Sequence, residues 1–140
     1  VAACAAAALG LEQALRGLPD RIARDVALTD RLRSALADLP DVAVHGDARD
    51  RLPHVVGCSA LYVDAEALLL ELARADISVA SGPACAAATG AASHVLAAMG
   101  ALTSGNVRIT LPVEATEEDI DRLLAVLPGI IGRMRAEAGL

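Results

Sequence analysis

One thiol in this 140-residue chain stands in a setting unlike those of the other two. Cys85 follows the turn Ser81-Gly82-Pro83 and precedes a run of very small residues at 86–92, a pattern that predicts a loop. A loop exposes a thiol, and a nearby cation or helix N-terminus would stabilise the nucleophilic thiolate. Arg108 or His94 would have to supply that stabilisation through the fold. The residues alone therefore leave both a reactive and an unreactive Cys85 open.

A charged residue interrupts an otherwise apolar strand further along the chain. Residues 106–111 alternate with period two, which places Arg108 opposite Val107, Ile109 and Leu111. Two interpretations stay open for Arg108. It belongs to a solvated strand face, or its guanidinium forms a fork that binds a substrate carboxylate.

The remaining cysteines lie in patterns typical of regular structure. Cys4 falls in an Ala-rich helix and Cys58 in a strand, and we expect both to be small core residues. Three cysteines cannot all pair within one chain, and neither they nor the histidines have metal-ligand spacing. We therefore expect no metal site and a reducing, cytoplasmic compartment.

Composition excludes several classes of partner. All 12 basic residues are arginine and are scattered along a chain of net charge −6, whose single aromatic residue is Tyr62. This balance argues against nucleic-acid binding. No apolar stretch is long enough to span a bilayer, so we expect no membrane partner. The chain begins with Val1 rather than methionine, which suggests a processed chain or a fragment.

The elements that position these groups follow from apolar periodicity. We expect a packed helix over about 2–16 and a second helix with Asp20 as its N-cap, ending at Pro40. The apolar stripe of the second helix is expected at Ile22, Val26, Leu32, Leu36 and Leu39, with Arg21, Arg24, Asp25, Asp30 and Arg31 largely outside it.

Strands and further helices follow. Residues 42–45 and 54–63 predict two strands that pair as a hairpin, and Asp64 caps a well-covered helix through Leu68–Leu72. A short strand is expected at 77–79, followed by a helix capped by Ser93. The last helix begins with Thr116 as its N-cap, and Pro128 is expected to kink or break it. The predicted class is α+β: a small mixed or mostly antiparallel sheet with helices on one face, plus the N-terminal helix.

Several segments, in this order and spacing, resemble the C-terminal part of cysteine desulfurases, pyridoxal phosphate (PLP) enzymes similar to class V aminotransferases. Residues 1–16 resemble the helix after the family's large domain. The other resembling segments are 52–68, the cysteine loop 81–85 with 93–100, and the arginine strand 106–111 with 116–121. The resemblance implies that residues 1–19 link to an absent large PLP domain and that 20–140 form the small domain.

The resemblance also implies roles. Cys85 corresponds to the catalytic cysteine that takes sulfur from L-cysteine as a persulfide, releasing alanine and passing sulfur to an acceptor protein of iron–sulfur assembly or thiolation. Arg108 corresponds to the arginine that binds the substrate carboxylate. The family's complete enzyme is a homodimer. Its PLP lysine lies in the large domain, and this chain contains no lysine and no cofactor-binding residue, so we expect it to be inactive alone.

Alternatives remain beside this interpretation. The chain could be a non-catalytic dimerisation or scaffold domain of the same fold, or the small domain of a class V aminotransferase or lyase without sulfur chemistry. The run at 86–92 predicts a weakly anchored loop that carries the thiol, or else an Ala-rich helix that begins near Ala84.

Overall fold

A computed structural model describes residues 1–82, 93–102 and 104–139. In these residues the elements follow in the order α1 (Ala2–Arg16), α2 (Leu18–Ala37), β1 (Val42–Val44), β2 (Val55–Ala60), α3 (Ala65–Arg74), α4 (His94–Ala98), β3 (Asn106–Thr110) and α5 (Glu117–Glu137). The strands form one antiparallel sheet in the order β1-β2-β3. The predicted α+β class and the predicted hairpin are confirmed.

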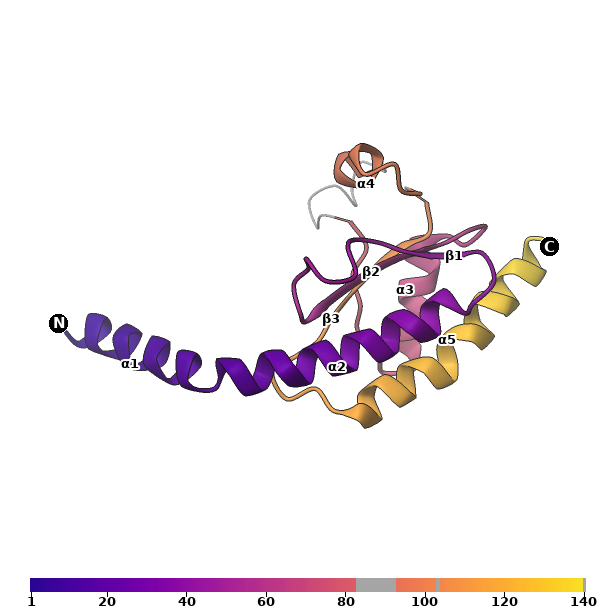
Figure 1. Cartoon of the computed structure of the whole chain (residues 1–140). Helices are drawn as coiled ribbons and strands as arrows, with labels where there is room; N and C mark the ends of the chain where they lie inside the picture. The colour runs from indigo at the N-terminus through magenta and orange to yellow at the C-terminus, as the bar shows by residue number, and fades with distance from the viewer. Residues whose placement is uncertain (83–92, 103, 140) are drawn as a thin grey trace.

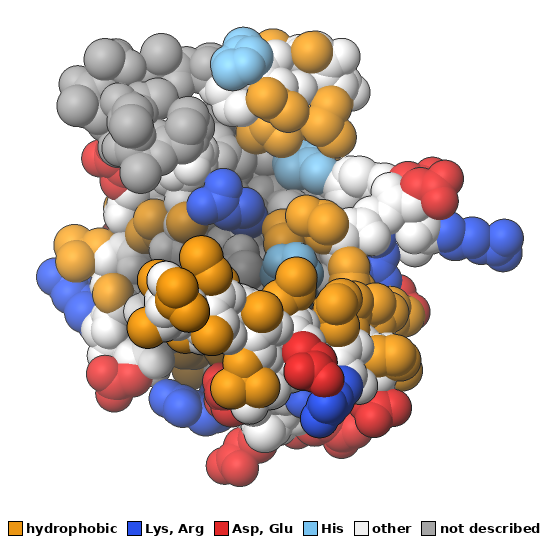
Figure 2. Space-filling model, turned by 90° about the vertical axis from the view of Figure 1, so that its left-hand side faces the viewer, with side chains coloured by type: hydrophobic (Ala, Val, Ile, Leu, Met, Phe, Trp, Pro, Cys, Tyr) orange, Lys and Arg blue, Asp and Glu red, His pale blue; other side chains and the backbone are white. Residues whose placement is uncertain are grey.

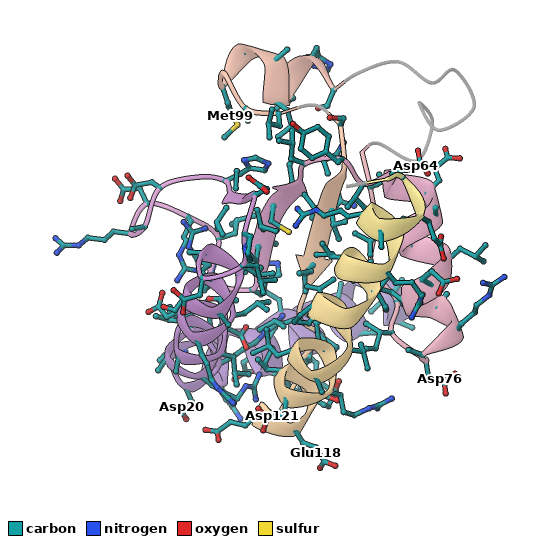
Figure 3. The ribbon with its side chains drawn as sticks, turned by 90° about the vertical axis from the view of Figure 1, so that its right-hand side faces the viewer. Asp20, Asp64, Asp76, Met99, Glu118 and Asp121 are labelled. Atoms are coloured by element: carbon teal, nitrogen blue, oxygen red, sulfur yellow. The ribbon has the colours of Figure 1, made fainter. Side chains whose placement is uncertain are left out.

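Three helices cover one face of this sheet. Helices α2 and α3 contact its strands, and α5 lies between them (Figures 1 and 3). The core is aliphatic because the chain has no Phe or Trp. It consists of Leu28, Leu32, Leu36, Val56, Cys58, Ala60, Val63, Leu68, Leu72, Val107, Ile109, Leu111, Ala115, Ile120, Leu123, Leu127, Ile130 and Ile131. The short helix α4 lies on the other side of the sheet, apart from these helices (Figure 3).

Helix α1 projects from this body and buries none of its residues in the described chain (Figure 1). The expectation of a packed first helix is therefore wrong here, and so is that of a buried Cys4, which is exposed. The physical reason is that no described element beyond α2 lies against α1. No helix among the described residues is both long and apolar enough to cross a membrane.

The start and the buried face of α2 also differ from expectation. The helix begins at Leu18 instead of after an Asp20 cap, because Gly17 keeps helical dihedral angles (φ −87°, ψ −5°). Asp25, expected outside, is only 1% exposed and accepts hydrogen bonds from Arg21 at 3.2 Å and from Arg24 at 3.1 Å. Leu32 and Leu36 of the predicted stripe are buried, together with Leu28, and Leu39 is partly buried against the core, whereas Ile22 and Val26 are exposed.

Other local predictions gave mixed results. Side chains cap three helices as predicted: Asp64 accepts from Ala67, Ser93 from Leu96, and Thr116 forms a capping box with Asp119. Helix α5 continues through Pro128 without a break, because five buried residues on both sides of it hold the helix on the core. Those residues are Ile120, Leu123, Leu127, Ile130 and Ile131. Leu70, expected to be covered, is 55% exposed.

Candidate substrate-binding face

Arg108 lies on the face of the sheet that α2, α3 and α5 leave uncovered. Along β3, Val107 and Ile109 are buried whereas Arg108 and Thr110 are exposed. The predicted alternation of this strand is therefore confirmed. Among the described residues, the Arg108 side chain has no hydrogen bond or ion pair that would occupy its guanidinium.

The two backbone neighbours of Arg108 carry very small side chains. On one side, Gly57 of β2 is its Cα partner. On the other, the Arg108 N–H donates to the Ala80 carbonyl at 2.6 Å, and the Ala80 N–H donates to the Arg108 carbonyl at 3.0 Å. Residues 77–79 do not form the expected strand; in the part of the chain that the structure describes, an isolated bridge at Ala80 is made instead. The guanidinium therefore rises from the sheet between a glycine and an alanine.

A histidine follows β1 on the same face. The His45 N–H donates to the Gly57 carbonyl at 2.8 Å, and its ring packs beside Gly57. His45 Nε2 lies 2.7 Å from Ser59 Oγ, and Ser59 Oγ donates to the Leu102 carbonyl at 2.9 Å. Because Ser59 has only one hydroxyl hydrogen, His45 Nε2 acts as the donor in the first of these bonds. Partial burial lowers the pKa of His45 below its ordinary value of 6.5.

The chain is attached to the sheet before the undescribed residues 83–92 and again after α4. On the entering side, the Gly82 N–H donates to Asn106 Oδ1 at 3.2 Å. On the returning side, the Leu102 carbonyl accepts from Ser59, and the Gly105 carbonyl accepts from the Ala60 N–H at 2.9 Å. Gly105 has φ +63°, and a Cβ there would lie 2.0 Å from the Ala60 carbonyl oxygen. Only glycine fits this crossing.

The structure describes Cys58 but not Cys85. Cys85 and the run after it lie outside the described residues, so the loop and the helix alternatives both remain predictions. Cys58 is buried on the core face as predicted, and desolvation raises the pKa of its thiol to about 11. Such a thiol stays protonated near neutral pH and is a poor nucleophile.

The described residues offer no metal centre: no group of three or more His, Cys, Asp or Glu side chains lies close enough to hold an ion. His94 is in the first turn of α4, and His54 precedes β2. The donor set does not fit covalent attachment of PLP either, since the sequence contains no lysine. What the uncovered face offers is an arginine fork beside the start of the Cys85 segment.

Sequence reasoning missed His45, Ser59 and Gly57 as members of this face. The paired strands bring them together, and only the register shows that Gly57 lies opposite Arg108. The alternation of Gly57 and Ser59 with the buried Val56 and Cys58 was the available signal.

The chain belongs to the class V aminotransferase family, whose model matches residues 2–123. Within this family its sequence is similar to cysteine desulfurases. It is 40% identical over 119 residues to the cysteine desulfurase of Trichormus azollae, covering 82% of this chain and 30% of that protein. With the cysteine desulfurase of Azospirillum brasilense the identity is 41% over 98 residues, covering 68% and 25% of the two chains.

Solved structures agree with these sequence matches. A NifS-like protein from Rickettsia africae superposes with a TM-score of 0.73 at 26% identity, covering 88% of this chain and 33% of that one. Another NifS-like protein gives a TM-score of 0.77 at 25% identity, covering 91% and 32%. The chain thus spans about 30% of the length of the curated relatives it matches first.

Proposed function

We propose that this chain is the sulfur-accepting, C-terminal part of a PLP-dependent cysteine desulfurase that acts on L-cysteine. The observation that carries the proposal is the position of Arg108. Its guanidinium is exposed between Gly57 and Ala80, and its backbone is paired with the residue five positions before Cys85. The identity to cysteine desulfurases supports the same reaction class.

In this proposal Arg108 binds the substrate's carboxylate. A guanidinium donates two parallel hydrogen bonds to a carboxylate, which fixes the orientation of the amino acid as well as its position. The residue is well suited to that task because β3 is the edge of a paired sheet, and its opposite side is anchored by the buried Val107 and Ile109. A rigid strand holds the fork in one place.

Cys85 is the proposed sulfur acceptor. Its thiolate attacks the sulfur of L-cysteine, an S–S bond forms, and the substrate C–S bond breaks. The electron pair of that bond stays on the substrate carbon, which takes up a proton and becomes alanine. The product on the chain is a Cys85 persulfide. Cys58 does not compete near neutral pH because burial keeps its thiol protonated.

PLP supplies electron withdrawal from the bound amino acid, and the part of the enzyme that holds it is not in this chain. The chain has no lysine, so we propose that it is inactive alone and requires that cofactor-binding part. The holoenzyme is then this chain together with the cofactor-binding part and PLP. We further propose that it is a cytoplasmic homodimer and passes sulfur to an acceptor of iron–sulfur assembly or thiolation.

We propose that α1 and the start of α2 contact the cofactor-binding part, with residues 1–19 as the link and 20–140 as the small domain. An exposed apolar stripe supports this contact. Its members recur every three or four positions along the two helices, at Leu11, Leu15, Leu18, Ile22 and Val26. Figure 2 looks toward the projecting helix and shows apolar side chains gathered over it. Contiguous exposed apolar surface of this kind marks a protein contact.

The test is sulfide release from L-cysteine by the holoenzyme in the presence of a reducing thiol. The Cys85→Ser variant should lose at least about 99% of this activity, because the alcohol cannot accept sulfur as a persulfide. The control is Arg74→Gln, at an exposed side chain of α3 that pairs with Glu71 in the described chain, and it should leave release unchanged. Unchanged sulfide release by Cys85→Ser would favour a lyase that does not use this thiol, and no release by the wild-type holoenzyme would favour an aminotransferase or a scaffold domain.

A further inference from the structure

The uncovered sheet face has a vacant position directly beside Arg108, at Gly57. In the antiparallel pairing, Gly57 and Arg108 are Cα partners, so their side-chain positions lie on the same face. The Arg108 N–H and carbonyl are both bonded to Ala80 on its other side. Gly57 and Arg108 are therefore a non-hydrogen-bonded pair, the closer of the two antiparallel arrangements. Any side chain at position 57 would stand next to the guanidinium stem.

The fold itself does not require glycine at this position. Gly57 is not among the glycines with positive φ. Among the described residues, a Cβ built there meets only His45 Cβ at 3.7 Å and His45 Cδ2 at 3.8 Å, which is ordinary van der Waals contact. Glycine weakens a strand interior, and there it often marks a place where a ligand approaches the backbone. This contrasts with Gly105, where a Cβ would collide with backbone.

His45 forms the far wall of this vacant position. Its ring is held by the Nε2 contact to Ser59 at 2.7 Å, and its backbone N–H is held by the Gly57 carbonyl. Ser59 is completely buried and is itself hydrogen-bonded to the Leu102 carbonyl, so Ser59 holds the His45 ring in one orientation. Among the described residues, the Gly57 backbone therefore lies between a fixed imidazole and Arg108 and carries no side chain of its own.

We propose that Gly57 is a specificity-determining residue of this site: its missing side chain opens a slot between Arg108 and His45 through which an amino-acid carboxylate reaches the guanidinium. The proposal rests on the carboxylate-binding role proposed for Arg108. It adds Gly57 as the residue that leaves the path of the carboxylate to Arg108 open. A larger residue at position 57 fills the slot and weakens carboxylate binding without altering the arginine.

The test is an NMR titration of the ¹⁵N-labelled full chain with L-alanine, using L-alaninamide as the probe that lacks a carboxylate. L-Alanine should shift the Gly57 amide and the Arg108 Nε–H resonances, and L-alaninamide should not. Gly57→Val should weaken L-alanine binding at least about fivefold by steric exclusion, with Gly57→Ala intermediate.

The matched control is Ala43→Val, because Ala43 is exposed, pairs with Ser59 and so lies on the same face of β1, outside the slot. It should leave L-alanine binding unchanged. Equal binding by wild type and Gly57→Val would overturn the slot while leaving the carboxylate role of Arg108 intact. No L-alanine shift in the wild-type chain would overturn the slot as well. In that case the proposed function is judged separately, by sulfide release from the Cys85→Ser holoenzyme.

Discussion

Arg108 and Ala80 exchange two backbone hydrogen bonds, at 2.6 and 3.0 Å, across the edge of the sheet. This pair joins the strand that carries the guanidinium to the chain segment that leads toward Cys85. Asn106, on the same strand face, adds a side-chain bond to the Gly82 N–H. The start of the cysteine segment and the proposed carboxylate-binding residue thus share one rigid support.

Replacement of Arg108 tests the substrate contact. In the holoenzyme, Arg108→Gln should lower kcat/KM for L-cysteine about 10- to 100-fold, the value of one or two charge-assisted hydrogen bonds. The kcat/KM of Arg108→Lys should lie between those of wild type and Arg108→Gln, since an ammonium keeps the charge and loses the fork. Steady-state kinetics measure the effect. Arg74→Gln is the control, because Arg74 is exposed and pairs only with Glu71 in the described chain; an equal loss in both variants would contradict the assignment.

Gly105→Ala tests the crossing of the returning chain over β2. The substitution places a Cβ 2.0 Å from the Ala60 carbonyl oxygen at a residue with φ +63°. We expect the free energy of unfolding to fall by at least about 2 kcal/mol. Gly132→Ala lies in helix α5, where the new Cβ meets no described atom within 4 Å apart from its chain neighbours and the adjacent helix backbone, and it should instead add up to about 1 kcal/mol. Urea denaturation distinguishes the two, and equal stability of both variants would show that the chain accommodates a Cβ at position 105 without strain.

The Cys58 thiol predicts a stability change at alkaline pH. Its pKa is about 11 in the folded chain, raised by desolvation from an ordinary value of 9.0. Between these pH values the unfolded chain loses the proton and the folded chain keeps it, so stability falls as pH rises from about 9 to 11. The loss attributable to this thiol is on the order of 2–3 kcal/mol. Denaturation of wild type and Cys58→Ala across this range measures it; parallel pH profiles would contradict a desolvated thiol.

The Arg135 side chain is hydrogen-bonded to the turn before β1 and to the turn after β2. Its guanidinium donates to the carbonyls of Leu61 at 3.1 Å, Pro40 at 2.9 Å and Asp41 at 3.1 Å. Arg135→Lys cannot reach all three, so the free energy of unfolding should fall by about 1–3 kcal/mol. Arg133→Lys, at an exposed pair with Glu71, should change it by less than about 0.5 kcal/mol. Thermal unfolding compares the two, and equal effects would mean that the three carbonyl contacts add little.

Local chemistry was the most predictable part of the fold. The caps at Asp64, Ser93 and Thr116 were found because each side chain needs only backbone N–H groups within three residues. The face of Arg108 was predictable for the same reason, since strand alternation is local. The burial of Asp25 was not, because it depends on Arg21 and Arg24 neutralising the carboxylate inside the packed molecule.

The other residues of the candidate site were not predictable, because strand pairing between distant segments brings them together. His45 and Gly57 are brought together by the registration of β1 on β2, which a single sequence specifies only through the finished sheet. The exposure of Cys4 and of Leu11 likewise depends on what lies against α1, and that information is not in this chain. The role of Cys85 follows from family resemblance rather than from geometry.

The most direct test of the central claim is mass spectrometry of the holoenzyme after incubation with L-cysteine. Trypsin cleaves this lysine-free chain at arginine, which places Cys4, Cys58 and Cys85 on separate peptides, 1–16, 52–74 and 75–108. Blocking free thiols before digestion preserves the sulfur state. We predict that the 75–108 peptide gains one sulfur atom when L-cysteine and PLP are both present, and that the other two peptides do not. A 75–108 peptide without added sulfur, from a holoenzyme that releases sulfide, would contradict the proposal that Cys85 accepts the sulfur.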